Sequence, residues 1–233
     1  MHGNTELGNG GTEIIANAAQ SVEDTAGASA LAIRRRLRAA RSAMTPQQRQ
    51  QASARICALL AQPGPRQWPV LVGRRGIVPQ VIAAFWPLAE EPDLRTVLRQ
   101  WVTQGYTVVL PDVVREASPL TFRRWQPEAP MQADRYGIPV PVGAPCVPDT
   151  LLVPTLGFTL HADRLGYGGG YYDRTLAALA ESGAAPLTIG VAFDCGRLEP
   201  FEHQPAPHDI ALDAVLTEHG WLCPSPRFPA DGG

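Results

Sequence analysis

Lysine is absent from this chain of 233 residues: every basic residue among its 20 Lys and Arg positions is arginine. Any cationic contact to a phosphate must therefore come from a guanidinium group, which offers a planar fork of hydrogen-bond donors. An excess of positive charge is absent as well, because the formal net charge is -2. Chains that bind nucleic acid usually carry a basic surplus, so we expect no nucleic-acid partner.

Paired cysteines are also lacking. The four cysteines lie far apart, with no CxxC pair and no Cys/His group at the spacing of zinc ligands: Cys57, Cys146, Cys195 and Cys223. Scattered cysteines in a chain of this length are typical of free thiols in a reducing compartment, with two disulfides as the less favoured alternative.

Long apolar runs and a basic N-terminus are missing too. No stretch approaches the roughly 20 apolar residues that cross a bilayer. The first basic residue is Arg34, and four acidic residues precede it, which is the opposite of a secretory or mitochondrial targeting segment. Because 18% of the residues are charged and 45% are hydrophobic, the composition is that of an ordinary globular protein. We expect it in the cytoplasm, without a membrane contact.

The chain divides into three parts by composition. Residues 1–28 are rich in Gly, Asn, Ala and Thr, and residues 224–233 are rich in Pro and Gly, so both ends are predicted to be flexible tails. Residues 29–223 are long enough to bury a core and are predicted to form a single domain. This domain begins with a helix over about 30–43 and a second helix after Thr45-Pro46, a capping residue followed by proline at the first helical position.

Apolar runs and helical patterns alternate after the second helix, which is predicted to stop at Pro63–Pro65. Strands are predicted from short apolar runs, and helices from apolar residues that recur every three or four positions. The predicted strands are Val81–Trp86, Tyr106–Leu110 (ended by Pro111), Leu120–Trp125, Leu151–Pro154, Leu187–Phe193 and Ala211–Thr217, and the predicted helices are Leu94–Val102 and Tyr171–Glu181. This alternation indicates an α/β fold in which helices cover both faces of a mostly parallel sheet, and ligands bind at the carboxyl ends of its strands.

The segment Arg164–Arg174, with the sequence RLGYGGGYYDR, carries the strongest chemical signal. Four glycines in five residues let the backbone approach a ligand closely. A glycine turn that leads into a helix directs backbone N–H groups at one point, in front of the positive end of the helix, and such an arrangement binds phosphate. Asp173, in the first helical turn, would cap the helix or hold a metal ion bound to phosphate. By itself the pattern also fits a plain tight connection, and it is neither a Walker A loop nor a dinucleotide fingerprint.

This segment resembles the signature of the 5-formyltetrahydrofolate cyclo-ligase family, also called methenyltetrahydrofolate synthetases. The similarity extends over about residues 30–222 and includes these further segments: Ile33-Arg34, Leu37-Arg38, Phe85–Glu91, Tyr136–Pro139, Val191–Asp194 and His208–Val215. The resemblance implies a three-layer α/β/α fold similar to that of phosphosugar isomerases and CoA-transferases. It also implies that ATP drives the cyclisation of 5-formyltetrahydrofolate to 5,10-methenyltetrahydrofolate, with release of ADP and phosphate, through a phosphorylated formyl group.

The same resemblance assigns ATP and a divalent cation to the glycine segment. The implied ATP-binding residues are Arg34, Arg164, Gly166, Tyr167, Gly168, Gly169, Gly170, Tyr171 and Tyr172. Asp173 and Asp209 match metal-binding carboxylates of the family, which implies Mg²⁺, and Arg164 and Tyr172 are the implied catalytic residues. Many members carry a lysine at the position of Ala30, so this chain offers one cation fewer to ATP.

For the folate, the resemblance implies aromatic side chains and one carboxylate. Trp86, Tyr136 and Tyr172 match positions that line the folate pocket, where aromatic faces suit a flat ring. Glu91 matches the residue that contacts the folate ring, and a carboxylate accepts the paired donors of a pterin edge. Judged without the resemblance, Glu91 is an exposed loop acid and Trp86 is a core residue.

Two other functions stay open at this point. A paralogue that binds nucleotide or folate without turnover is suggested by the missing lysine at Ala30, and a sugar-phosphate isomerase or CoA-transferase relative is suggested by the expected architecture. The leading hypothesis is a monomeric ligase whose partners are two small substrates, 5-formyltetrahydrofolate and ATP.

Overall fold

The structure is a computed structural model, and it describes residues 29–71, 78–200, 202–206 and 209–224. The tails predicted over 1–28 and 224–233 lie outside the described residues, apart from Pro224.

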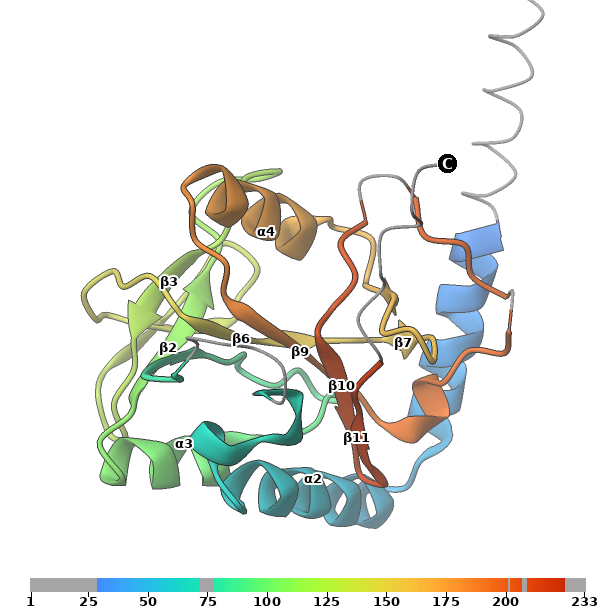
Figure 1. The fold of residues 1–233 in the computed structure, drawn as a ribbon, viewed down its shortest axis with the longest axis horizontal. Helices are drawn as coiled ribbons and strands as arrows, with labels where there is room; N and C mark the ends of the chain where they lie inside the picture. Colours follow the sequence, from blue (N-terminus) through green and yellow to red (C-terminus); the bar gives the residue numbers. More distant parts are fainter. Residues whose placement is uncertain (1–28, 72–77, 201, 207–208, 225–233) are drawn as a thin grey trace, which may run out of the picture.

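A seven-stranded sheet forms the centre of the molecule, in the order β11–β10–β9–β6–β1–β2–β3 (Figure 1). The central five strands run parallel, while β3 and β11 pair antiparallel at the two edges. The strands are β1 (Val81–Ala83), β2 (Thr107–Asp112), β3 (Thr121–Arg124), β6 (Thr150–Pro154), β9 (Leu187–Val191), β10 (Ala214–Thr217) and β11 (Gly220–Leu222). The prediction of a mostly parallel sheet is therefore confirmed.

Helices cover both faces of this sheet. Figure 1 shows α2 (Pro46–Ala61) and α3 (Arg95–Thr103) on one face and α4 (Tyr171–Glu181) on the other. One apolar cluster joins the sheet to α2 and α3, and a second joins it to α4. The predicted apolar face of α3 is buried as expected, namely Leu94, Val97, Leu98 and Trp101. The three-layer α/β/α prediction is confirmed.

The start of α2 follows from its capping residues. Thr45 accepts a hydrogen bond from the backbone N–H of Gln48, and the Gln48 side chain accepts one from the backbone N–H of Thr45. This reciprocal pair satisfies two backbone donors that the first helical turn leaves free, and Pro46 at the first helical position needs no donor. The cap predicted from Thr45-Pro46 is confirmed.

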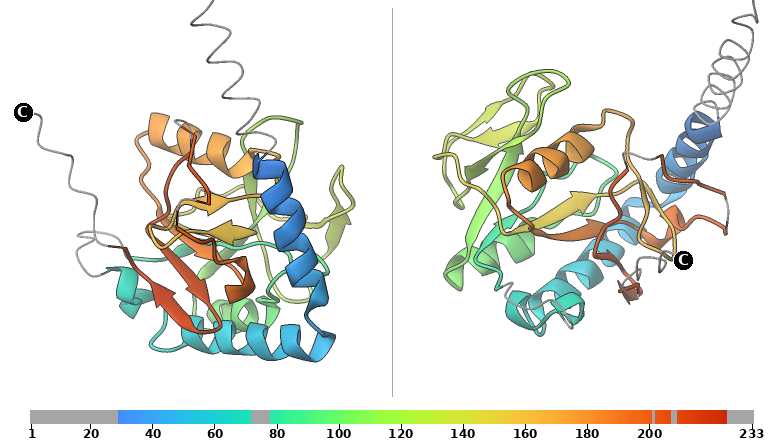
Figure 2. Two further views of the ribbon diagram at one scale, coloured as in Figure 1. Left: turned by 90° about the vertical axis from the view of Figure 1, so that its right-hand side faces the viewer. Right: turned by 45° about the horizontal axis from the view of Figure 1, so that its top comes forward.

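The first described helix, residues 29–43, stands beside the sheet rather than over a face of it (Figure 2). Ile33 and Leu37 are buried against Leu156, Leu165 and Leu198, which form a third, smaller apolar cluster. Because this apolar stripe faces the segment after β6, the arginines of the same helix lie next to the glycine segment. The helix therefore places positively charged side chains from the N-terminal part of the chain beside the candidate site.

Several predicted strand limits were wrong. The strand predicted over Leu187–Phe193 ends at Val191, and the one predicted over Ala211–Thr217 begins at Ala214. The strand that begins at Val81 ends at Ala83 rather than Trp86, because the chain leaves the sheet and then turns at residues 88–91. Pro111 does not end β2, which continues to Asp112. Since β1 pairs with β2 only as far as Val109, the last residues of β2 have a free side, where a proline is tolerated.

Two short hairpins were missed because each strand has only two or three residues, too few to show alternation. One pairs β4 (Met131–Ala133) with β5 (Pro139–Pro141), and the other pairs β7 (Gly157–Phe158) with β8 (Arg164–Leu165). The second hairpin matters for function, since its second strand, β8, is the start of the glycine segment and contains Arg164.

Candidate active site

A cavity of about 1080 Å³ lies at the carboxyl ends of β1, β2 and β6. Residues that follow these strands, among them Phe85, Val113 and Pro154, form part of its wall. All of the site residues suggested by the sequence also line it: Arg34, Trp86, Glu91, Tyr136, Arg164, Gly166, Tyr167, Gly168, Gly169, Gly170, Tyr171, Tyr172, Asp173 and Asp209. The cavity is slightly larger than the roughly 300–1,000 Å³ of a typical small-molecule site, so it has room for more than one ligand.

The glycine segment turns sharply into α4. Gly168 and Gly170 have φ values of 99° and 61°, in the left-handed region that favours glycine. Gly170 is the capping position of α4, and among the described residues no side chain caps the free N–H groups of its first turn. These N–H groups and the helix dipole favour an anion at this point of the cavity.

Three arginines donate hydrogen bonds to the backbone of the glycine segment. Arg34 Nε donates to the carbonyl oxygen of Gly166 at 2.9 Å, and Arg174 donates to that of Gly169 at 2.5 Å. Arg38 donates to the carbonyl oxygen of Tyr167 at 3.4 Å. Since carbonyl oxygens accept these bonds, the backbone N–H groups of the segment remain available to a ligand, and the guanidinium of Arg34 adds positive charge beside them.

Arg164 joins the two candidate metal-binding segments. Its side chain is only 5% exposed, and one terminal nitrogen donates to the carbonyl oxygen of Ile210 at 2.9 Å while the other pairs with the carboxylate of Asp173. Asp209, next to Ile210, accepts a bond from the backbone N–H of Ala206 at 2.8 Å. Asp173 and Asp209 therefore belong to segments held by the same guanidinium.

These two carboxylates do not form a ready metal site. No group of three or more His, Cys, Asp or Glu residues suited to a metal ion occurs in the described part of the chain. A magnesium ion that arrives with a nucleotide needs only one or two protein carboxylates, because phosphate and water supply its other ligands. Asp173 and Asp209 on the wall of the same cavity fit that modest requirement.

Glu91 is buried rather than exposed, so the interpretation of an exposed loop acid was wrong. Its Oε2 accepts the backbone N–H of Leu88 at 2.9 Å, and its own N–H donates to the carbonyl oxygen of Leu88 at 3.0 Å. This tight turn directs the carboxylate toward the cavity instead of solvent. Burial raises the pKa of the Tyr172 hydroxyl, as does the charge of Glu91, so that Tyr172 stays protonated and remains a hydrogen-bond donor.

Trp86 is half-buried at the wall of the cavity, and two side chains pack against its ring. The guanidinium of Arg95 lies 5.5 Å from the centre of its ring, and Trp125 packs against it at 6.5 Å. The interpretation of Trp86 as a core residue is therefore only half right, because its ring borders the cavity as well as the core.

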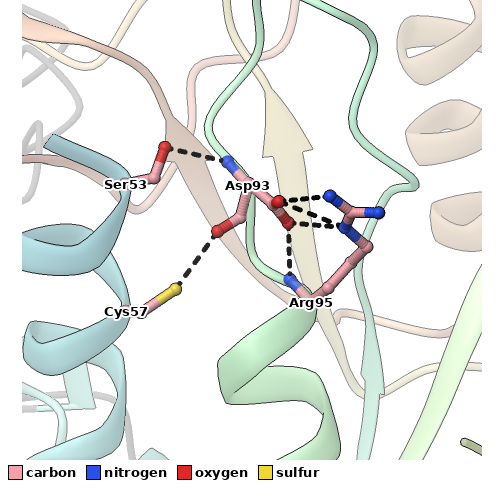
Figure 3. Close-up of polar contacts among 4 residues, drawn as sticks. All are labelled: Ser53, Cys57, Asp93 and Arg95. Carbon is pink, nitrogen blue, oxygen red and sulfur yellow. Dashed lines mark hydrogen bonds and ion pairs between the residues drawn. The ribbon is translucent and has the colours of Figure 1, made fainter. Parts of the chain in front are cut away.

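Figure 3 shows what holds Arg95 in place. The Asp93 carboxylate accepts bonds from the Arg95 backbone N–H at 3.0 Å and from its guanidinium at 2.6 to 3.1 Å. The Asp93 backbone is tied to α2, since its N–H donates to Ser53 at 3.1 Å and its carbonyl oxygen accepts the Cys57 thiol at 3.3 Å. The Arg95 guanidinium lowers the pKa of Asp93, so the pair remains ionised well into acid.

Tyr136 reaches the cavity from the turn between β4 and β5 and is largely exposed. Its hydroxyl lies 2.6 Å from that of Tyr171 in α4, and the two rings meet edge to face at 6.2 Å. The shared hydrogen bond raises the pKa of Tyr136. These two tyrosines join the β4–β5 hairpin to α4 at the wall of the cavity.

Sequence reasoning missed two polar residues near the site. His203 lines the cavity, and within the described chain its Nε2 atom is buried without a hydrogen-bond partner. Burial lowers the pKa of this imidazole, although Asp209 and Asp163 act in the opposite direction. Arg41 is buried beneath the glycine segment. A signal for Arg41 existed, because Arg34, Arg38 and Arg41 are spaced to share one face of a helix.

Two further expectations from the sequence concern free cysteines and helices that could cross a membrane. All four cysteines are free thiols, as predicted, and Cys57 is the buried one. Among the described helices, none is both long enough and apolar enough to pass through a bilayer.

Comparison with known proteins gives consistent matches. A sequence profile of the 5-formyltetrahydrofolate cyclo-ligase family matches residues 26–218. The 5-formyltetrahydrofolate cyclo-ligase of Mycolicibacterium smegmatis is 32% identical over 148 residues, which make up 59% of this chain and 73% of that protein. The protein of that name from Escherichia coli K12 is 29% identical over 191 residues, 78% of this chain and 96% of its own length.

A solved structure supports the fold. The NMR structure of the Aquifex aeolicus 5,10-methenyltetrahydrofolate synthetase matches with a TM-score of 0.66 at 22% identity, covering 88% of this chain and 96% of that one. At this identity the likeness concerns the fold alone.

Proposed function

Because the chain belongs to the 5-formyltetrahydrofolate cyclo-ligase family, we propose that its cavity brings 5-formyltetrahydrofolate and ATP together and closes the folate ring to 5,10-methenyltetrahydrofolate. The observation that supports this proposal best is that every residue suggested for either substrate lines one cavity. Those residues come from segments more than 170 positions apart, so their convergence is a property of the fold and not of one local motif.

The glycine segment and α4 form the phosphate end of the site in this proposal. Free N–H groups at the start of α4 bind the phosphates, and Arg34 adds a positive charge beside Gly168. Arg164 is already bound to Asp173 and Ile210, so it acts as a fixed charge near the transferred phosphoryl group. Fixed charges stabilise phosphoryl transfer because they need no reorganisation in the transition state.

The reaction itself needs an activated formyl oxygen, because an amide oxygen is a poor leaving group. The formyl oxygen attacks the γ-phosphorus of ATP, and ADP leaves. The neighbouring amine nitrogen then attacks the formyl carbon, and the C–O bond breaks so that phosphate departs with the proton of the amine. Tyr172 serves as a neutral donor to oxygen in these steps, since burial raises the pKa of its hydroxyl.

The folate ring lies between Glu91, Trp86 and Tyr136 in this proposal. Glu91 accepts the donors of the pterin edge, and the two aromatic side chains border the flat parts of the molecule. Asp173 and Asp209 would hold Mg²⁺ with the nucleotide, and the ion would supply positive charge to the phosphates. We further propose a single domain over residues 29–223, a monomeric state and a cytoplasmic location.

The test is an absorbance assay for 5,10-methenyltetrahydrofolate with 5-formyltetrahydrofolate and Mg²⁺, run with and without ATP. Product that appears only with ATP, together with equal amounts of ADP, supports the ligase. A folded preparation that binds ATP but forms neither product contradicts it and favours the non-catalytic paralogue suggested by Ala30. Isomerisation of a sugar phosphate without ATP would instead favour the isomerase relative.

A further inference from the structure

We propose that Tyr171 is a positioning residue, whose hydroxyl holds the Tyr136 ring in place at the folate end of the cavity. This inference rests on the proposed function and deepens it, because it gives the Tyr171 side chain a role in folate binding although its backbone belongs to the glycine segment. Sequence reasoning suggested Tyr171 only for ATP.

The contact between the two side chains is direct. Their hydroxyl oxygens lie 2.6 Å apart, and their rings meet edge to face with centres 6.2 Å apart. A hydroxyl both donates and accepts, so the bond forms whichever oxygen supplies the shared hydrogen. Tyr136 is 53% exposed, and an exposed ring that a ligand must first order binds that ligand less tightly. The bond to Tyr171 orders the Tyr136 ring before the folate arrives.

Tyr171 is a firm support because two neighbours hold its ring. The Arg174 guanidinium lies 5.2 Å from the ring centre and also donates to the carbonyl oxygen of Gly169 at 2.5 Å. The ring lies against Gly169 itself, since a Cβ atom added there would be 3.0 and 3.2 Å from two ring carbons. Gly169 therefore leaves the space that the ring occupies, and the position of the ring depends on the glycine segment.

The turn that carries Tyr136 is held through its backbone. The Asp134 carboxylate accepts hydrogen bonds from the N–H groups of Tyr136 at 2.8 Å and Ile138 at 2.9 Å. The Arg135 guanidinium lies 5.5 Å from the centre of the Tyr136 ring. These contacts hold the base of the side chain and its ring, while Tyr171 holds the hydroxyl at the far end. The Tyr136 ring is thus fixed between the β4–β5 hairpin and α4.

The two substrates should respond differently when the Tyr171 hydroxyl is removed. In the proposed function, the phosphates are bound by backbone N–H groups at the start of α4 and by Arg34, and the Tyr171 hydroxyl is not among these groups. A phenylalanine at this position keeps the ring that packs against Gly169 and Arg174. A merely structural role for Tyr171 would therefore affect both substrates alike, whereas a positioning role for its hydroxyl affects the folate.

The experiment is calorimetric titration of the full chain with 5-formyltetrahydrofolate and, separately, with a non-hydrolysable ATP analogue. Tyr171→Phe removes only the hydroxyl. We expect the folate to bind about fivefold more weakly, while the affinity for the ATP analogue changes by less than about twofold. Tyr106→Phe is the matched control, because Tyr106 is half-buried like Tyr171 but lies outside the wall of this cavity, and both affinities should be those of the wild type.

A double-mutant cycle with Tyr136→Phe completes the test. Either single variant breaks the same bond, so the double variant should bind the folate within about twofold of Tyr136→Phe alone. Wild-type folate affinity in Tyr171→Phe, an equal loss for both ligands, or two losses that multiply in the double variant overturns the positioning inference. A wild-type protein that binds folate but forms no product would instead count against the proposed function and leave the positioning result standing, while a wild type that binds no folate overturns both.

Discussion

Arg34 and Gly166 are joined across 132 residues of sequence by a 2.9 Å hydrogen bond from the Arg34 Nε to the Gly166 carbonyl oxygen. This bond fixes the first helix against the glycine segment and leaves the guanidinium 3.7 Å from the position a Gly168 side chain would occupy. The positive charge is thus held beside the proposed phosphate site before any ligand arrives, and the missing lysine at Ala30 makes this arginine more important.

Arg34→Met should raise the KM for ATP by about tenfold, because it removes a charged partner of the phosphates but keeps the apolar length of the side chain. The KM for 5-formyltetrahydrofolate should change by less than about twofold. Steady-state kinetics with each substrate varied in turn measures both, and Arg35→Met on the exposed side of the helix is the control. An unchanged KM for ATP would remove Arg34 from the nucleotide site.

Asp173→Asn should lower kcat by at least about a hundredfold if Asp173 holds the metal ion with the nucleotide. The amide oxygen of Asn can still accept the bond from Arg164, so the fold should survive, which circular dichroism and thermal unfolding would verify. Asp112→Asn is a matched control, because Asp112 pairs with Arg123 at 2.7 Å in a similarly buried setting outside the cavity wall. Full activity of Asp173→Asn, or an equal loss in Asp112→Asn, would contradict the metal role.

Glu91→Gln should weaken the binding of 5-formyltetrahydrofolate by about tenfold or more and should weaken the binding of ATP much less. The reason is that a neutral amide loses the charge-assisted bonds to the pterin edge. Glu90→Gln provides the neighbouring control, because Glu90 is only half-buried and contacts Ser42 instead of lining the cavity. Calorimetry on both variants with both ligands measures the difference. Equal losses for folate and ATP would show that Glu91 supports the site as a whole and not the folate.

The parts of the site that sequence could predict are those with a local pattern. The glycine segment and Asp173 could be identified because a turn and the helix after it are encoded within ten consecutive residues. The limits of β1 and β2 could not be predicted well, because they depend on which neighbour each strand finds in the sheet. The burial of Glu91 was equally out of reach, since Glu91 is part of a cavity wall whose other members extend along the chain from Ser29 to Asp209.

Cys57 should react more slowly with a disulfide reagent than the exposed cysteines of the native protein. Burial raises its pKa to about 11, so very little thiolate exists at neutral pH, and its hydrogen bond to Asp93 adds protection. A disulfide reagent at pH 8 should label Cys195 and Cys223, which are exposed, well before Cys57. Mass spectrometry after timed quenching identifies the labelled positions, and denaturant should make all four cysteines react alike. Early labelling of Cys57 would show that α2 opens from α3 in the native state.

The Asp93–Arg95 pair should stabilise the fold at neutral pH and lose its effect in acid. The pKa of Asp93 in the folded protein is below the usual 3.8, because Arg95 stabilises the carboxylate. Its contribution is therefore complete above about pH 4 and is lost as the pH falls through the lowered value. Asp93→Asn should reduce the free energy of unfolding by up to about 1 kcal/mol at pH 7, since the pair is partly exposed, and the difference from wild type should shrink below pH 4.

Urea unfolding followed by tryptophan fluorescence at several pH values measures this difference, with Arg95→Met as the reciprocal variant. A difference that is the same at pH 7 and pH 3 would mean that the charge of the Asp93 carboxylate does not contribute to stability.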